Sequence, residues 1–307
     1  MLRLVPGSRP LLRPGPMTRR FPACRRAMVL TASLALASCG TGSTATAKGA
    51  STTTTVATTT TLATTATTTP NRVADSSPAV AATSPVRAPV VVGLGNSVPS
   101  GTACSCQNFV SAYAALVAAA TNTKPTVNND AVPGSTSADV VNQLATATVQ
   151  GQLRSATTVL IMTGANDFND AFDQVSLGAP APASYGPVAT AVQDNVTAIA
   201  EKIHAINAAA HVVVLDYWAA MEDGAVAAKD YDTPTMAAAV ASTTYVNNAL
   251  AVAAKTTGTM YVSTYTAFKG PNGTVDPTAL LAADGDHPDA AGHQVIAKAI
   301  YAVLPNG

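Results

Sequence analysis

A serine and a histidine that lie far apart in the chain stand in local sequences suited to nucleophilic chemistry. Ser97 follows the apolar run 90–94 and a Gly-Asn pair, and His287 lies three residues after Asp284 near the end of the chain. A serine hydroxyl is a weak nucleophile until a base takes its proton, and an aspartate can orient that base. These residue types predict a nucleophile (Ser97), a general base (His287) and an orienting carboxylate (Asp284).

Two further segments offer hydrogen-bond donors for the charge that develops on an attacked carbonyl oxygen. Gly134 follows a proline, and Asn166 stands in the sequence Thr-Gly-Ala-Asn-Asp-Phe. Fixed N–H donors of this kind stabilise the transition state of acyl transfer. The candidate donors are the backbone N–H groups of Ser97 and Gly134 and the side-chain amide of Asn166. Taken singly, Gly134 is as well explained as a turn glycine and Asn166 as a cap at a strand end.

The segment around Ser97 matches no phosphate-binding motif. Val98 stands where the dinucleotide fingerprint needs its third glycine, and the lysine of phosphate loops is absent. The Gly-x-Ser-x-Gly elbow of the α/β-hydrolases is absent too. We therefore expect no nucleotide cofactor at this turn.

The remaining acidic and basic candidates are weaker. Asp286 is next to His287 in sequence, and we expect it to point elsewhere. The other histidines (His204, His211 and His293) have no acid at suitable spacing, and we expect His293 to be a packing or capping residue. The run 167–173 resembles a cation-binding loop only loosely, so we expect neither a metal ion nor another cofactor.

Valine-rich runs alternate with alanine-rich helical patterns over residues 89–307, which we interpret as one domain. The apolar runs predict strands at 90–94, 157–162, 212–215 and 260–262, and a weaker one at 125–132. Helical patterns lie between and after them, at 109–120, 138–147, 188–208, 236–255 and 290–303. This alternation predicts an α/β fold with a parallel sheet covered on both faces. Ser97, Gly134 and Asn166 each follow a strand, so they are expected on one edge of the sheet.

Residues 1–39 have the pattern of an export signal. Seven arginines precede the apolar stretch 27–37, which is shorter than the roughly 20 residues that cross a bilayer. The sequence Leu-Ala-Ser-Cys39 resembles a bacterial lipobox, as in exported lipoproteins of the actinobacterial type. We expect Cys39 to be lipidated and the protein to be anchored to the outer face of the cell membrane, or secreted. An ordinary cleavage near Ala37 is the alternative.

Residues 40–88 are expected to be a disordered linker. Threonine fills 16 of the 30 positions from 41 to 70, and such a segment has no aromatic side chain to bury. Seven of the 17 basic residues belong to the export signal, so ten basic residues face 17 acidic ones in the rest of the chain. An acidic balance argues against a nucleic-acid partner.

We expect a monomer that acts on a small ester or an acylated glycan.

Cys104 and Cys106 are the cysteines that follow Cys39. Outside the cell they are expected to oxidise, and a local disulfide between them would stiffen the loop after Ser97. Free thiols and a metal site are the alternatives. Two cysteines with no nearby histidine make a poor zinc site.

Four blocks of this sequence resemble, in order, those of the SGNH hydrolases, also called the GDSL esterase/lipase family. They are Gly95-Asn-Ser97, Ala131-Val-Pro-Gly134, Gly164-Ala-Asn-Asp167 and Asp284-Gly-Asp-His287-Pro. The resemblance runs from residue 90 to near the end of the chain. It implies a flavodoxin-like, three-layer α/β/α sandwich with a five-stranded parallel sheet, and it implies the roles given above for the serine, histidine, aspartate and oxyanion donors. Asn96 stands where the family usually has aspartate, from which we expect altered hydrogen bonding and retained chemistry.

The leading hypothesis is therefore a serine hydrolase that cleaves carboxylic esters through an acyl-serine intermediate. Acyl or acetyl esters of lipid or carbohydrate are the expected substrates. Acyl transfer to an envelope glycan and a catalytically silent surface-binding lipoprotein are the alternatives. Segments 168–187 and 218–235 are expected to form loops beside the site, and their small side chains do not reveal the acyl group.

Overall fold

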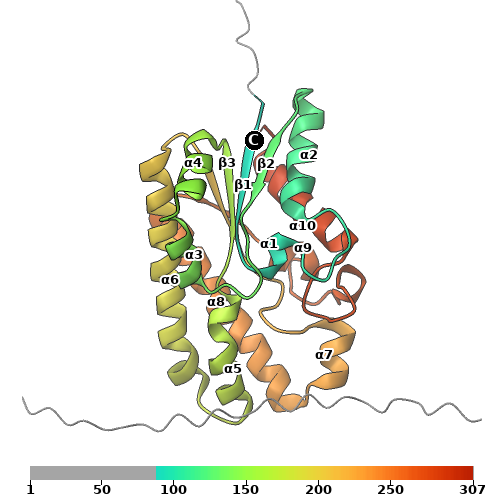
Figure 1. Ribbon diagram of the computed structural model, residues 1–307. Helices are drawn as coiled ribbons and strands as arrows, with labels where there is room; N and C mark the ends of the chain where they lie inside the picture. Colours follow the sequence, from blue (N-terminus) through green and yellow to red (C-terminus); the bar gives the residue numbers. More distant parts are fainter. Residues whose placement is uncertain (1–87, 307) are drawn as a thin grey trace, which may run out of the picture. The chain divides into compact units, whose positions relative to one another are not determined.

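Five parallel strands form the sheet at the centre of residues 88–306, the part of the chain that the computed structural model describes (Figure 1). The strands are β1 (Val90–Gly95), β2 (Thr126–Asn129), β3 (Thr158–Met162), β4 (His211–Leu215) and β5 (Met260–Val262), in the spatial order β2-β1-β3-β4-β5. Each pairing is parallel. The α/β expectation is confirmed. The export signal, Cys39 and all but the last residue of the linker 40–88 lie outside the described residues.

The central strands read as continuous apolar runs because helices cover both of their sides. Side chains of β1 and β3 such as Val91, Val92, Leu160 and Ile161 are fully buried. When both faces of a strand are covered, the side chains on either face enter the core, so neither face is polar. This pattern is typical of parallel sheets. The weaker run at 125–132 forms only the short edge strand β2, whose side chains are half-buried or exposed.

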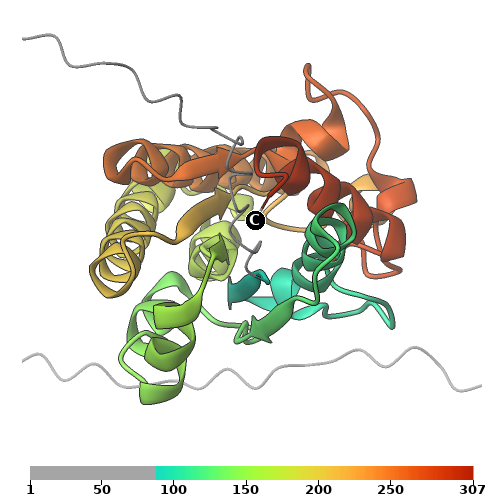
Figure 2. The same cartoon turned by 90° about the horizontal axis from the view of Figure 1, so that it is seen from above.

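Helices form a layer on each face of the sheet (Figure 2). On one face α2 (Phe109–Thr121) packs against α10 (Ala290–Val303), and α9 (Thr264–Lys269) packs against α10. On the other face α6 (Ala181–Ile206) packs along α8 (Thr233–Thr257). The three-layer sandwich implied by the resemblance is therefore the observed architecture.

Two expectations about helices are wrong in detail. The pattern 138–147 holds only α3 (Ser137–Gln143), and a second, unpredicted helix, α4 (Ala147–Ser155), begins where the pattern ends. Thr146 caps this new helix by accepting a hydrogen bond from the Val149 N–H. The segments expected to be loops contain helices. Segment 168–187 holds α5 (Asn169–Ser176) and the start of α6, and segment 218–235 holds α7 (Gly224–Asp230) and the start of α8.

Glycine and proline explain why those two segments were expected to be loops. These residues interrupt both segments, as they do in turns, and α5 and α7 are only eight and seven residues long. Within residues 88–306, no helix has the length and apolar character needed to cross a membrane.

Candidate active site

Ser97 lies directly past the carboxyl end of β1, as the first residue of the short helix α1 (Ser97–Ser100). The chain turns sharply at Gly95, whose φ is 136°, and a β-carbon there would collide with the carbonyl oxygen of Met162. The next N–H, of Asn96, donates to that same oxygen over 3.2 Å. Glycine is therefore needed at this turn, and the turn fixes the serine against the end of β3.

Asn96 is 1% exposed and bonds on two sides. Its Oδ1 accepts from the Val98 N–H over 3.3 Å, which caps α1. Its Nδ2 donates to the hydroxyl oxygen of Tyr217, 2.8 Å away. The asparagine thus links the serine turn to the segment after β4.

Asn166 lies after β3 in the 3-10 helix η1 (Ala165–Phe168), and its side chain reaches toward the β2–α3 loop. Its Nδ2 donates to the backbone oxygen of Ser135 over 2.9 Å. Gly134 precedes that serine, is exposed, and has a φ of 81°. The two predicted oxyanion donors thus belong to neighbouring, hydrogen-bonded segments, and one amide hydrogen of Asn166 remains for another acceptor.

Asp167 joins the same two segments, a role that the sequence analysis missed. Its carboxylate accepts from the Ser137 N–H (2.9 Å) and the Ser137 hydroxyl (2.6 Å), at the start of α3. Burial raises the pKa of Asp167, and the bonds from Ser137 oppose that rise. The only sequence signal was its place beside Asn166, because its partner lies 30 residues earlier.

Asp284 and His287 form the expected pair. Asp284 Oδ2 lies 2.9 Å from His287 Nδ1, while Oδ1 accepts from the backbone N–H groups of Asp286 and His287 at 3.1 Å each. Burial opposes ionisation of Asp284, but these hydrogen bonds outweigh it and lower its pKa. His287 Nε2 is buried and has no hydrogen-bond partner within residues 88–306, Ser97 included. The ring is oriented through Nδ1, and Nε2 is left free to accept a proton.

Asp286 does not point away from the histidine, so that expectation is wrong. Its Oδ2 lies 3.7 Å from His287 Nδ1, beyond hydrogen-bond length but close enough for an electrostatic interaction. Burial raises its pKa, the neighbouring His287 opposes that rise, and the charge of Asp284 adds to it. Two carboxylates therefore flank one imidazole nitrogen, and only Asp284 is bonded to it.

A cavity of about 280 Å³ opens beside the serine. Ser97, Asn166 and Asp284 all line it, so the structure brings these three predicted residues to one site. Gly134 and His287 are not among the lining residues. Gly134 is next to Ser135, whose backbone oxygen is bonded to Asn166. The His287 side chain is 13% exposed and belongs to the loop that also holds Asp284.

The cavity wall is polar and carries negative charge. Glu222 and Asp286 line it with Asp284, and no lysine or arginine does. Burial raises the pKa of Glu222, and the charges of Asp230, Asp286 and Asp284 raise it further. An uncharged ligand suits this wall better than an anionic one.

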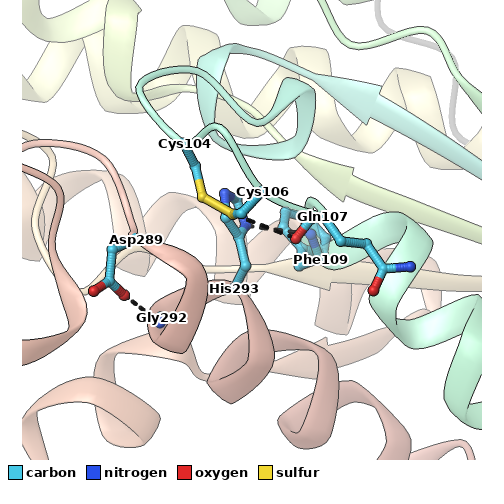
Figure 3. The surroundings of a disulfide bond; sticks show 7 residues. All are labelled: Cys104, Cys106, Gln107, Phe109, Asp289, Gly292 and His293. Carbon is cyan, nitrogen blue, oxygen red and sulfur yellow. Dashed lines mark hydrogen bonds between the residues drawn. A yellow bond between two sulfur atoms is a disulfide. The ribbon is translucent and has the colours of Figure 1, made fainter.

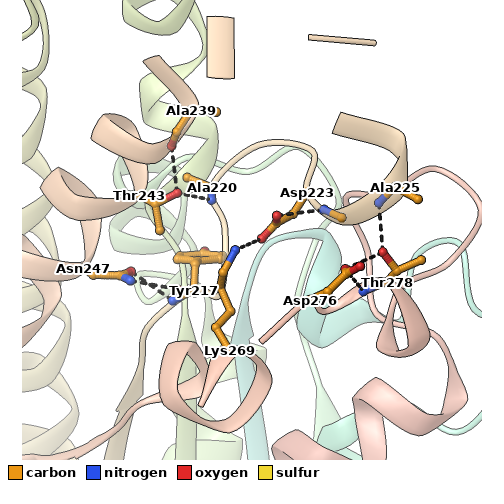
Figure 4. A network of polar contacts seen from close by, with 11 residues as sticks. Tyr217, Ala220, Asp223, Ala225, Ala239, Thr243, Asn247, Lys269, Asp276 and Thr278 are labelled. Carbon is orange, nitrogen blue, oxygen red and sulfur yellow. Dashed lines mark hydrogen bonds and ion pairs between the residues drawn. The ribbon is translucent and has the colours of Figure 1, made fainter. Parts of the chain in front are cut away.

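Hydrogen bonds fix the segment between β4 and α7 that closes one side of the cavity (Figure 4). The backbone of Tyr217 exchanges two bonds with the side chain of Asn247 on α8. Farther along, Asp223 pairs with Lys269 on α9, and its N–H donates to the Gly285 oxygen over 2.8 Å. The Asp284–His287 loop is thereby attached to the wall that faces Ser97.

Cys104 and Cys106 form a disulfide in the loop between α1 and α2 (Figure 3). The absence of a histidine nearby in the sequence was misleading, because His293 of α10 lies beside them, with ligand atoms of all three within 4.8 Å of one another. His293 is fully buried, and its Nδ1 accepts from the Phe109 N–H at the start of α2. That bond places the proton of the neutral ring on Nε2. The expected packing and capping role of His293 is confirmed.

Comparison with known proteins agrees with this fold. No curated protein matches the chain, but among solved structures a lipase from a goat rumen metagenome is 18% identical (TM-score 0.59; 70% of this chain and 97% of that one covered). Phospholipase A1 from Streptomyces albidoflavus is 20% identical (TM-score 0.52; 70% and 99% covered). An extracellular lipase from Streptomyces rimosus is 21% identical (TM-score 0.50; 70% and 99% covered). At these identities the likeness shows the fold.

The family model that matches this sequence covers residues 94–295, about two thirds of the chain. The matched range begins just before the Gly95–Ser97 turn and ends after the Asp284–His287 loop, so it contains every segment that builds the cavity. The chain therefore belongs to the GDSL-like lipase/acylhydrolase family.

Proposed function

We propose that this protein hydrolyses carboxylic esters through an acyl-enzyme formed on Ser97. Membership of the family supports ester hydrolysis in general. The residue roles are our own inference. The observation that carries them is the cavity lined jointly by Ser97, Asn166 and Asp284, with an aspartate-oriented histidine on the adjoining loop.

In the proposed acylation step, His287 Nε2 takes the proton of the Ser97 hydroxyl while the oxygen attacks the ester carbonyl. Asp284 holds the imidazole by Nδ1 and stabilises the imidazolium that forms. The imidazolium then gives its proton to the leaving alcohol, and the Ser97 ester remains. Water, deprotonated by the same Nε2, attacks this ester. The imidazolium returns its proton to the Ser97 oxygen as the acid leaves. The acylation step requires Ser97 and His287 Nε2 to come within hydrogen-bond reach when substrate binds, as catalytic hydrogen bonds often do.

The negative charge of each tetrahedral intermediate needs donors. We assign the Ser97 and Gly134 N–H groups and the second amide hydrogen of Asn166 to it. The bond from Asn166 to Ser135 holds the amide and the Gly134 loop in a common arrangement before substrate arrives. Removing one such preorganised donor raises the activation free energy by about 3–4 kcal/mol.

Replacing the nucleophile tests the proposal. Ser97→Ala should reduce turnover of a soluble aryl ester by at least about four orders of magnitude, because the remaining groups have no atom to acylate. Ser155→Ala is the matched control, since this serine lies before β3 at the opposite edge of the sheet. Full activity of Ser97→Ala would refute the assignment.

Acyl transfer is the competing outcome of the same intermediate. A sugar hydroxyl in place of water would resolve the Ser97 ester into a new ester. Product analysis with an acceptor sugar present separates the two reactions, and free acid as the main product supports hydrolysis.

We also propose that the enzyme works outside the cell, attached by a lipid on Cys39. This proposal rests on the lipobox-like sequence alone.

A further inference from the structure

Tyr217 stands at a position that the proposed chemistry does not yet use. It lies two residues past the end of β4, is 1% exposed, and lines the cavity together with Ser97 and Asn166. Its hydroxyl meets the side chain of Asn96, the residue just before the nucleophile. A polar group in this place can act on whatever occupies the cavity.

The direction of the Asn96–Tyr217 hydrogen bond is fixed by the bond on the other side of the amide. Val98 N–H is a donor only, so the amide oxygen must face it. The amide nitrogen therefore faces Tyr217 and donates to the hydroxyl oxygen. Tyr217 is the acceptor in this pair.

The hydroxyl hydrogen of Tyr217 is consequently free. Within residues 88–306 the bond with Asn96 uses the hydroxyl oxygen, and no acceptor receives the hydrogen. Burial raises the pKa of Tyr217 far above its usual value, so the hydroxyl keeps its hydrogen. A buried donor without an acceptor costs stability unless a ligand or water satisfies it.

The tyrosine is also held rigidly. Its N–H donates to Asn247 Oδ1 over 3.0 Å and its backbone oxygen accepts from Asn247 Nδ2 over 2.7 Å (Figure 4). Asn96 holds the other end of the residue by its hydroxyl. A donor fixed at both ends loses little entropy when it bonds to a ligand.

We propose that the Tyr217 hydroxyl donates a hydrogen bond to an oxygen of the bound ester, and that Asn96 turns this donor toward the cavity. The inference rests on the proposed function and adds a specificity residue to it. An ester presents two oxygens as acceptors, so it satisfies the hydroxyl. A ligand without an oxygen acceptor at this point would leave the buried hydroxyl unpaired.

The test uses two substitutions that change the same hydrogen bond in different ways. Tyr217→Phe removes the donor. Asn96→Asp keeps the link between the two side chains but reverses it, because a carboxylate accepts the tyrosine hydrogen and so withdraws it from the cavity. Both variants should lose about tenfold to a hundredfold in kcat/KM for an aryl ester at alkaline pH, where the introduced carboxyl is ionised. The double variant should lose no more kcat/KM than the less active of the two single variants.

Tyr113→Phe is the control, since Tyr113 is also a fully buried tyrosine but bonds the backbone oxygen of Leu304 at the end of α10. Its kcat/KM should stay within twofold of the parent, and thermal melting of every variant checks the fold. The inference is overturned if Asn96→Asp keeps full activity while Tyr217→Phe loses it, because the link alone would then suffice. Full activity of Tyr217→Phe overturns it as well. Failure of the Ser97 assignment is recognised separately, by turnover in Ser97→Ala.

Discussion

At the scale of single residues, the two carboxylates near His287 differ in their geometry relative to its ring. Asp284 bonds the ring nitrogen at 2.9 Å and accepts two backbone N–H groups, whereas Asp286 lies at 3.7 Å without a bond to the ring. The same loop lowers the pKa of Asp284 and raises that of Asp286. The bonded carboxylate is the one that can hold the ring and balance its charge.

Exchanging each carboxylate for an amide should separate the two roles. Asp284→Asn should lower kcat by about two to four orders of magnitude, since the ring loses its orienting acceptor and takes the wrong tautomer. Asp286→Asn should lower kcat by less than tenfold. Steady-state kinetics on one aryl ester compares them, and equal losses would contradict the assignment of Asp284 as the orienting group.

Sequence reasoning could single out these residues because each has its partner or its strand end nearby in the chain. Asp284 and His287 are three residues apart, and Ser97 and Asn166 each follow an apolar run. It missed Asp167 and Tyr217, whose partners Ser137 and Asn96 lie 30 and 121 residues away. Only the folded sheet brings such pairs together.

At the scale of elements, α10 ties the catalytic loop to the rest of the domain. It begins shortly after His287 and packs against α2, where His293 Nδ1 accepts from the Phe109 N–H. The same ring lies against the Cys104–Cys106 disulfide (Figure 3). Burial lowers the pKa of His293 from 6.5 to about 4, so the folded protein keeps it neutral.

This histidine makes stability depend on pH in a defined direction. Between pH 6.5 and about 4 the unfolded chain binds a proton at residue 293 that the folded chain does not, so the free energy of unfolding falls as the pH falls. The full contribution is about 3 kcal/mol. His293→Asn keeps an acceptor for Phe109 and removes the titration.

Denaturant unfolding at pH 7 and pH 4.5 measures the effect. The parent protein should lose more stability between these two values than His293→Asn does. The comparison isolates residue 293, because the buried carboxylates titrate in both proteins. An identical pH dependence in parent and variant would show that His293 is not buried as a neutral ring.

At this scale, sequence reasoning was least accurate for the short helices. The four apolar strands and helix 290–303 were predicted nearly in place because their apolar patterns are clear, whereas the weaker run 125–132 forms only the short strand β2. Helices α5 and α7 were expected as loops because they are short and stand in segments with glycine and proline. The apolar face of α5, which includes Ala171, Phe172 and Val175, is only two turns long.

At the scale of the whole molecule, the sheet brings together groups from opposite ends of the domain. Ser97 follows the first strand, and the loop with Asp284 and His287 precedes the last helix. The parallel order β2-β1-β3-β4-β5 places the carboxyl ends of the strands at one edge, where the cavity lies. A family model that spans 94–295 describes the same region as one unit.

Every role proposed for the site depends on Ser97 being the serine that His287 activates. Intact-mass analysis after treatment with a fluorophosphonate, followed by peptide mapping, should give a single adduct on Ser97 that forms in step with loss of esterase activity and is absent from Ser97→Ala. An adduct on another serine, or an unlabelled protein that still cleaves esters, would contradict this assignment.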